Sequence, residues 1–371
     1  MKIRYSLLLF VVLQSYFIRA QNCTEIERIL DSTYASSAFY GNVLITKNSE
    51  VLFEKSFGYS DAVKKTPLTK NNSFQLASIS KQFTAYGILI LKSRGKLEYD
   101  SMVCKYIPTF PYKNITIRHL ITHTSGLPNF WDKIRLNLDT TKSNGNKEVL
   151  DYLIKHPLPL QFEPGTKYEY ADIGYDFLAT IIENISGLSY KEFLFQNIFK
   201  PLKMKDTYAY MVTDISRIKN KNLAIGHSSE KGEYAYAHLQ PRFNFVTYLG
   251  DFYGDGSMVS TAKDLAKWDK ALRENTLLPA TIQSEAFAIP IFNGQELFAR
   301  TNPNIGYGFG WFIKDTPKGK LVYHSGGHPG NMHIIYRFLD TGVTCIFLSN
   351  TETAVIKALR SRILAELQRN E

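Results

Sequence analysis

Apolar runs with strand-like periodicity lie close to both ends of the chain. Gly41 to Lys47 and Glu50 to Ser56 flank the polar pair Asn48 and Ser49, a pattern typical of a β-hairpin. Four further strands are predicted near the C-terminus, over Gly306 to Lys314, Lys320 to Ser325, His333 to Leu339 and Val343 to Ser349. This grouping favours an antiparallel sheet.

Helical patterns lie before, between and after these strands. A first helix is predicted over Glu25 to Ser37 and a last one over about Thr353 to Gln368. The stretch between Asp100 and Leu202 is also helical in pattern. We therefore predict an α+β fold, in which an antiparallel β-sheet is flanked by the terminal helices and carries an inserted, mainly helical lobe.

The N-terminal residues have the layout of a secretory signal peptide. Lys2 and Arg4 precede the apolar run Leu7 to Leu13, and Ala20 offers a cleavage point. The run is shorter than the roughly 20 residues of a permanent span. We expect residues 1–20 to be removed and the protein to be secreted, into the periplasm of a bacterium. Lipid attachment at Cys23 is a weaker alternative, because Asn22 fits a lipoprotein signal poorly.

Residues 21–371 are expected to form one catalytic unit. Its α/β lobe covers about 21–99 and 206–371, and its helical lobe covers about 100–205. An apolar content of 44% in a chain of 371 residues suits a globular enzyme.

The formal net charge is +10, and it becomes +7 when the signal peptide leaves with Lys2, Arg4 and Arg19. The surplus is scattered and forms no basic stripe, which argues against a nucleic-acid partner. Cys23, Cys104 and Cys345 are an odd number of distant cysteines, from which no disulfide framework follows.

The most informative short motif is Ser78-x-x-Lys81, at the start of the apolar helical run Phe83 to Leu91. Residues three apart share one helix face. An amine beside a serine hydroxyl can accept its proton, which is one of the few ways to activate serine without histidine. The helix N-terminus also favours the negative charge that develops there.

Two further motifs follow downstream. Pro164 to Tyr175 places Tyr170 before a helix, and Leu321 to Gly327 is an apolar strand that runs into a glycine turn. With Ser78 and Lys81, in this order, they resemble the serine β-lactamase and penicillin-binding-protein superfamily, in the branch of class C β-lactamases and D-alanyl-D-alanine carboxypeptidases. The resemblance covers about Gly41 to Asn350 and includes Ile115 to Pro128, Pro201 to Thr207 and Gly256 to Leu265.

The resemblance implies a β-lactamase/transpeptidase-like fold and a role for each motif residue. Ser78 would be the acylated nucleophile, Lys81 its proton partner and Tyr170 the proton relay to the leaving group. The N–H groups of Ser78 and Gly327 would form the oxyanion hole.

Asp172 departs from the branch pattern, which has asparagine at this position. An ionised carboxylate can only accept hydrogen bonds, so the amide donor to an acylamino substrate is missing. If Asp172 lies near Lys81, it would hold the lysine protonated and shift the base role toward Tyr170. Efficient β-lactam turnover is therefore not expected.

His324, Ser325 and Gly326 stand where many relatives in this branch have Lys-Thr-Gly, and the resemblance makes them substrate-binding. We expect His324 at the cleft edge as a conditional cation, so that recognition of a carboxylate substrate weakens from about pH 6 to 8. Gly326 and Gly327 would let the substrate backbone approach closely.

No cofactor or metal is implied. His119 and His123, like His324 and His328, are four residues apart, but neither pair has the glutamate of a zinc-binding H-E-x-x-H motif. Trp311 is expected in the core. Four aromatic residues are candidate walls of the cleft: Phe130, Trp131, Phe252 and Tyr253.

Together these features predict a secreted serine hydrolase that acts through a covalent acyl-enzyme on D-alanyl peptides or related D-amino amides. The alternatives are a class C type β-lactamase, a short-chain esterase and a non-catalytic penicillin-binding sensor. The predicted partner is a peptide, β-lactam or ester substrate. The sequence indicates no permanent membrane span and leaves the oligomeric state open.

Overall fold

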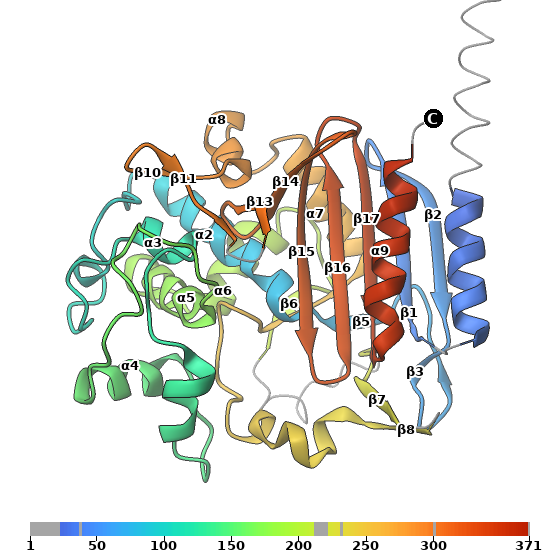
Figure 1. Ribbon diagram of the computed structural model, residues 1–371, viewed down its shortest axis with the longest axis horizontal. Helices are drawn as coiled ribbons and strands as arrows, with labels where there is room; N and C mark the ends of the chain where they lie inside the picture. Colours follow the sequence, from blue (N-terminus) through green and yellow to red (C-terminus); the bar gives the residue numbers. More distant parts are fainter. Residues whose placement is uncertain (1–22, 37–38, 211–221, 231–232, 300–301, 370–371) are drawn as a thin grey trace, which may run out of the picture.

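An eight-stranded antiparallel sheet forms the centre of the computed structural model, which describes residues 23–36, 39–210, 222–230, 233–299 and 302–369 (Figure 1). In spatial order its strands are β12 Phe298–Ala299, β13 Asn302–Tyr307, β14 Phe312–Thr316, β15 Gly319–His328, β16 Asn331–Phe338, β17 Val343–Ser349, β1 Gly41–Lys47 and β2 Glu50–Phe57. The pairing of Val43 with Phe347 joins the two ends of the chain. The predicted signal segment lies outside the described residues.

The predicted α+β fold is confirmed, with one correction to the strands. Gly306 to Lys314 was predicted as a single strand and that prediction is wrong, because the chain reverses between β13 and β14. The Gly308 N–H donates to the Trp311 carbonyl at 2.8 Å, and Gly310 adopts a φ of +80°. A side chain on Gly310 would meet the Gln82 backbone at 2.9 Å, so the turn packs directly against a helix.

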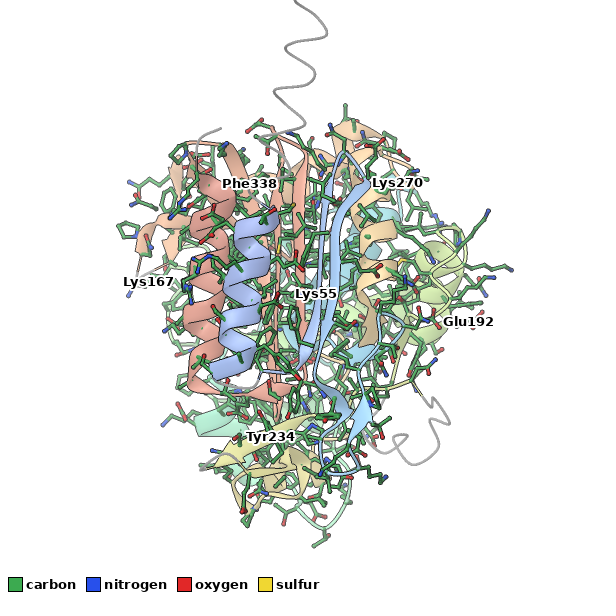
Figure 2. All side chains as sticks on the ribbon, turned by 90° about the vertical axis from the view of Figure 1, so that its right-hand side faces the viewer. Lys55, Lys167, Glu192, Tyr234, Lys270 and Phe338 are labelled. Atoms are coloured by element: carbon green, nitrogen blue, oxygen red, sulfur yellow. The ribbon has the colours of Figure 1, made fainter. Side chains whose placement is uncertain are left out.

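Helices at the two ends of the chain cover one face of the sheet. Residues 23–36 are helical, and α9 (Ala354–Gln368) lies beside them (Figure 2). Ile29, Phe347 and Leu359 belong to the apolar core between these helices and the sheet. Lys55 on β2 bonds to Glu27 at 2.7 Å, which ties the first helix to the sheet edge.

The other face of the sheet packs on a larger core with the remaining helices. Phe83, Trp268, Val322 and Ile346 are fully buried members of this core. The helices are α2 Lys81–Ser93, α3 Ile117–Ile121, α4 Asn146–Lys155, α5 Asp172–Ser186, α6 Tyr190–Leu194, α7 Ala262–Arg273 and α8 Ala280–Gln283. Four of them, α3 to α6, lie in the stretch that was predicted to be helical.

Short elements complete the described chain. The small strands are β3 Tyr59–Asp61, β4 Thr66–Pro67, β5 Ser73–Gln75, β6 Tyr208–Ala209, β7 His227–Glu230, β8 Glu233–Tyr236, β9 Met258–Thr261, β10 Ile291–Phe292, β11 Gln295–Glu296 and β18 Thr351–Glu352. The short helical segments are η1 Ala77–Ser80, η2 Val103–Lys105, η3 Phe130–Ile134, η4 Arg135–Asn137, η5 Phe195–Phe199, η7 Ala237–Leu239, η8 Pro241–Thr247 and η9 Ser284–Phe287. No helix in the described ranges is both long and apolar enough to span a bilayer.

Gly326 sets the distance between β15 and η1. A Cβ atom on Gly326 would lie 2.1 Å from the carbonyl oxygen of Leu76, far inside van der Waals contact, whereas one on Gly327 meets nothing within 4 Å. Gly326→Ala should therefore destabilise the protein by about 1–3 kcal/mol, because the strand must move away from η1. Gly327→Ala is the matched control and should leave the unfolding midpoint in urea unchanged. Equal midpoints for the two variants would show that this contact does not constrain the fold.

Candidate active site

Ser78 lies on a strained turn between a strand and a helix. β5 leads into η1, and η1 continues directly into α2. Ala77, the residue before Ser78, has a φ of +48°, which is unusual for a residue with a side chain. The Leu76 N–H donates to the Met258 carbonyl at 2.8 Å, and the Met258 N–H donates to Ser80 Oγ at 3.1 Å. These two bonds hold both sides of the turn against β9.

Lys81 connects Ser78 to two other segments of the chain. Its ammonium group is fully buried and donates to Ser78 Oγ at 3.3 Å, to Asp172 Oδ1 at 2.7 Å and to the Asp255 carbonyl at 3.0 Å. Asp172 is the first residue of α5, where a negative charge is favourable to the helix dipole. The condition that the sequence left open, whether Asp172 lies close to Lys81, is therefore met.

Lys81 is an ammonium ion in this arrangement. Burial by itself lowers the pKa of Lys81, but the negative charge of Asp172, with contributions from Tyr170 and Asp255, raises it well above its ordinary value. A lysine in this state cannot take the proton of Ser78 unless its surroundings change.

Tyr170 completes the group around Ser78. Its ring lies 4.9 Å from Lys81 Nζ. Burial raises the pKa of Tyr170 to about 12, while Lys81 and Ser78 act in the opposite direction by favouring the phenolate. The Tyr170 hydroxyl is buried and has no hydrogen bond of good geometry to any described residue. It is thus a neutral phenol placed where loss of its proton would be assisted by the neighbouring ammonium.

His123 holds the segment that carries Tyr170. The Ala171 N–H donates to His123 Nδ1 at 3.1 Å, and the imidazole packs on the Tyr170 ring with a centroid separation of 4.2 Å. From the sequence, His123 was singled out only with His119, as a possible pair of zinc ligands. His119, the other member of that pair, lies at the N-terminal cap of α3. There its Nδ1 accepts a hydrogen bond from the Thr116 N–H. In the described residues no three metal-ligating side chains gather.

Two acidic residues that sequence analysis missed lie beside Asp172. Asp176 follows it by one turn of α5, and Asp255 comes from the loop before β9. Burial, followed by the charges of Asp255 and Asp172, raises the pKa of Asp176 well above its usual value. The i,i+4 spacing of Asp172 and Asp176 was a visible signal that they share a helix face. Nothing in the sequence indicated that Asp255 would join them.

His324 does not have the position that was predicted for it. The side chain is fully buried, its Nδ1 N–H donates to the Ser325 carbonyl at 2.7 Å, and Nε2 bonds to the Tyr307 hydroxyl at 3.0 Å. Burial, with a smaller effect of the Lys81 charge, lowers the pKa of His324 to about 3. The prediction of a conditional cation at the cleft edge is therefore wrong, because the strand turns this ring into the core.

Gly326 and Gly327 on β15 were both predicted to face the substrate, but only Gly327 is placed to do so. Gly326 faces the backbone of Leu76 and not an open cleft. Gly327 is exposed and lines a pocket together with Ser78. Ser325, which precedes both glycines in β15, is half-buried.

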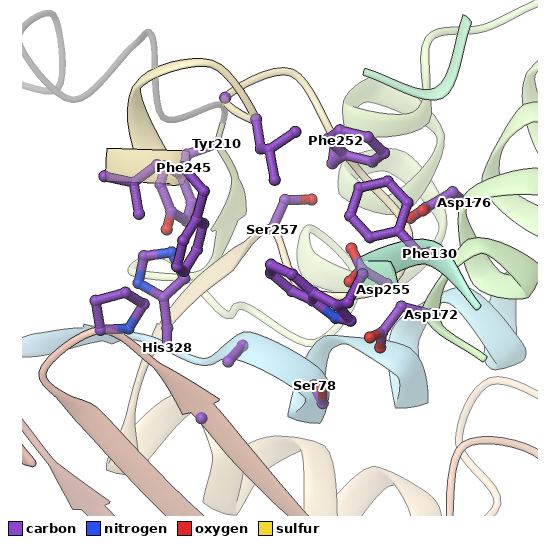
Figure 3. Close-up of a pocket in the computed structure, with 18 residues that line it drawn as sticks. Ser78, Phe130, Asp172, Asp176, Tyr210, Phe245, Phe252, Asp255, Ser257 and His328 are labelled. Carbon is purple, nitrogen blue, oxygen red and sulfur yellow. The ribbon is translucent and has the colours of Figure 1, made fainter. Parts of the chain in front are cut away.

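The pocket above Ser78 has a volume of about 190 Å³ (Figure 3). Three of the predicted aromatic walls, Phe130, Trp131 and Phe252, line it. Tyr253 does not, since its hydroxyl bonds to Glu183 at 2.6 Å. Trp311 is 2% exposed, in agreement with its predicted place in the core. The pocket also contains the carboxyl groups of Asp172, Asp176 and Asp255.

Comparison with known proteins identifies the class that this fold and site define. The Beta-lactamase family model matches residues 28–368, and the chain belongs to that family. Its relatives in the superfamily of serine β-lactamases and penicillin-binding proteins are serine hydrolases, and the fold is the β-lactamase/transpeptidase fold.

The chain is similar to several particular members of this superfamily. Penicillin-binding protein 4* of Bacillus subtilis (strain 168) is 37% identical over 316 residues, which are 85% of this chain and 68% of that protein. Protein flp of Staphylococcus aureus (strain MW2) is 30% identical over 292 residues, 77% of this chain but only 54% of the relative. The crystal structure of D-amino acid amidase from Ochrobactrum anthropi SV3 superposes with a TM-score of 0.73 at 25% identity, covering 92% of this chain and 99% of that one.

The buried ion pair should contribute far more to stability than an exposed one. Asp172→Asn removes the charge that compensates Lys81 and should lower the free energy of unfolding at pH 7 by about 3 kcal/mol in urea titrations. From neutral pH up to about pH 10.4, the pKa of an unfolded lysine, this contribution is fully present. It is lost only as the pH rises through the higher folded pKa of Lys81.

Asp100→Asn is the control for this measurement. It breaks the pair with Arg118, where Asp100 is 73% exposed, and should cost less than about 1 kcal/mol. Equal losses in the two variants would contradict the assignment of a buried, charged Lys81.

Because His324 is held neutral, its imidazole should not titrate between pH 5 and 8. The measurement is a pH series of the ¹⁵N-histidine spectrum, in which His324→Gln identifies the signal. A titration with a midpoint near 6.5 would restore the conditional cation and refute the buried neutral ring.

Proposed function

We propose that the protein is a serine hydrolase whose Ser78 forms a covalent acyl-enzyme with D-alanyl peptides or related D-amino amides. The observation that carries this proposal is the buried contact chain from Ser78 Oγ through Lys81 to Asp172 at the floor of a pocket. The similarity to a D-amino acid amidase and to a penicillin-binding protein supports the same chemistry. The signal-like residues 1–20 favour action outside the cytoplasm.

Acylation would proceed by a relay through Tyr170. Ser78 Oγ attacks the carbonyl carbon while its proton passes to the Tyr170 oxygen, and the Tyr170 proton passes to the leaving amine. The Lys81 ammonium stabilises the negative charge that develops on the phenol oxygen. The C–N bond breaks, an amine departs, and an ester on Ser78 remains.

Deacylation reverses these steps with water in place of the amine. Water adds to the ester carbonyl and gives one proton to the Tyr170 oxygen, while the Tyr170 proton passes to Ser78 Oγ. The ester C–O bond to Ser78 breaks, and the acid is released. In both halves the N–H groups of Ser78 and Gly327, which line one pocket, would bind the oxyanion. Neutral Tyr170 and charged Lys81 thus suffice for a relay that needs no free base.

The charges of the described pocket residues favour amides over substrates with a terminal carboxylate. His324 is neutral and buried, and the described residues that line the pocket include neither lysine nor arginine. A carboxypeptidase-like substrate would therefore lack a charged partner for its C-terminal group. D-Amino amides have no terminal carboxylate and therefore need no such partner.

Intact-mass spectrometry of acid-quenched mixtures tests the acyl-enzyme. The wild type should gain one acyl adduct from p-nitrophenyl butyrate, and Ser78→Ala should gain none. The same substitution should lower kcat/KM at least about 10³-fold. Unchanged turnover in Ser78→Ala would overturn the proposal.

The same measurement with benzylpenicillin separates the alternatives. An adduct that forms and is lost within seconds, with release of hydrolysed drug, would identify a class C type β-lactamase. Ser78-dependent turnover confined to esters would identify a short-chain esterase. A lasting penicillin adduct without turnover of any amide or ester would identify a sensor.

A further inference from the structure

The pocket above Ser78 has an acidic character that the acyl-transfer chemistry does not need. Its lining contains three carboxyl groups, and among the described lining residues there is no lysine or arginine. The one lining histidine, His328, has its pKa lowered to about 4 by burial and is neutral. Lys81, a described cation in contact with three of the lining residues, is already engaged by Asp172, Ser78 and the Asp255 carbonyl.

Among the residues that the structure describes, the charges around the pocket leave one negative charge without a partner. Asp176 and Asp255 interact closely enough for a hydrogen bond between their carboxyl groups, and mutual repulsion favours one proton shared by the pair. That leaves Asp172 and one charge on the pair, against which Lys81 supplies a single positive charge. A ligand with one positive charge would bring the site to neutrality.

Asp176 also presents an atom that lacks a partner. Its Oδ1 is buried, the residue is 2% exposed, and, apart from the proton that the carboxyl group shares with Asp255, no described residue donates a hydrogen bond to that oxygen. Figure 3 shows the carboxyl groups of Asp172, Asp176 and Asp255 on the same side of the pocket, beside Phe130. Leaving a buried acceptor unpaired is unfavourable, and a ligand N–H group would remove that cost.

A primary ammonium group fits these requirements. It carries one positive charge and three N–H donors, and carboxyl oxygens accept from it. The rings of Phe130, Trp131 and Phe252 line the same space, and aromatic faces attract cations.

The position relative to Ser78 indicates which ammonium group this would be. Lys81 Nζ contacts both Ser78 Oγ, at 3.3 Å, and Asp172 Oδ1, at 2.7 Å. The Asp172 carboxylate is therefore separated from the nucleophile by a single ammonium group. In an amino acid the α-nitrogen lies about 2.5 Å from the carbonyl carbon. An aminoacyl group on Ser78 can therefore direct its α-amino group toward these carboxyl groups.

We infer that Asp172, Asp176 and Asp255 form a subsite for the free α-ammonium group of the residue that acylates Ser78. The inference rests on the proposed acyl-enzyme function and specifies its substrate class as D-amino amides and peptides with an unblocked N-terminus. An N-acylated residue carries no positive charge on this nitrogen and has one N–H donor in place of three, so it would leave the excess negative charge of the carboxyl groups uncompensated.

Binding to Ser78→Ala tests the subsite without requiring turnover. By titration calorimetry at pH 7, D-alaninamide should bind at least tenfold more tightly than N-acetyl-D-alaninamide. The double substitution Asp176→Asn with Asp255→Asn, made in the same background, removes the unpaired charge while keeping side-chain shape. It should reduce the preference to less than threefold.

Glu274→Gln is the matched control, because it removes one carboxylate from an exposed helix end outside the pocket and should leave the preference intact. Equal or weaker binding of the free amine to Ser78→Ala would overturn the subsite. An unchanged preference in a folded double variant would overturn it as well.

Turnover of D-alanine p-nitroanilide and its N-acetyl form by the wild-type enzyme separates the two proposals. A preference of at least tenfold in kcat/KM for the free amine supports the subsite. Ser78-dependent turnover with preference for the N-acetyl form overturns the subsite and leaves the acyl-enzyme function standing. If neither compound nor p-nitrophenyl butyrate is turned over, the acyl-enzyme function fails, and the calorimetric result still decides the subsite.

Discussion

The ammonium group of Lys81 is the constraint on which the site depends. A fully buried charge is costly unless it is paired and hydrogen-bonded. Lys81 meets this requirement with three acceptors from η1, from the start of α5 and from the loop before β9. Segments that are remote in sequence must therefore meet at one point, and that point lies directly under Ser78.

The fold brings these segments together through close backbone contacts. Gly310 lets the β13–β14 turn touch the start of α2, and Gly326 lets β15 touch the residue before η1. The N-terminus of α2 is thus held between the sheet and α5. The positive φ of Ala77 is maintained because the neighbouring backbone is bonded to β9 on both sides.

The same charge network links chemistry and substrate choice. Asp172 keeps Lys81 protonated, so the lysine acts as a fixed positive charge and Tyr170 becomes the group that can exchange protons. The additional carboxyl groups of Asp176 and Asp255 then exceed what Lys81 can neutralise. Under the function proposed above, such a site would favour an acyl group that carries a positive charge. A site with a cation for a terminal carboxylate would favour a different substrate.

The sequence by itself determined most of the elements and the candidate catalytic pair. Periodicity located β1, β2, β15, β16, β17 and α9 within a few residues, and Ser78 and Lys81 are in contact as their motif predicted. These features are local, because apolar spacing and short motifs depend on residues close in the chain. The turn at Gly310, the inward rotation of His324 and the arrival of Asp255 beside Asp176 were decided by the tertiary structure. Each of these features depends on which distant segment packs against the residue. Burial and the charge of neighbouring groups arise from that packing and cannot be read from the local sequence.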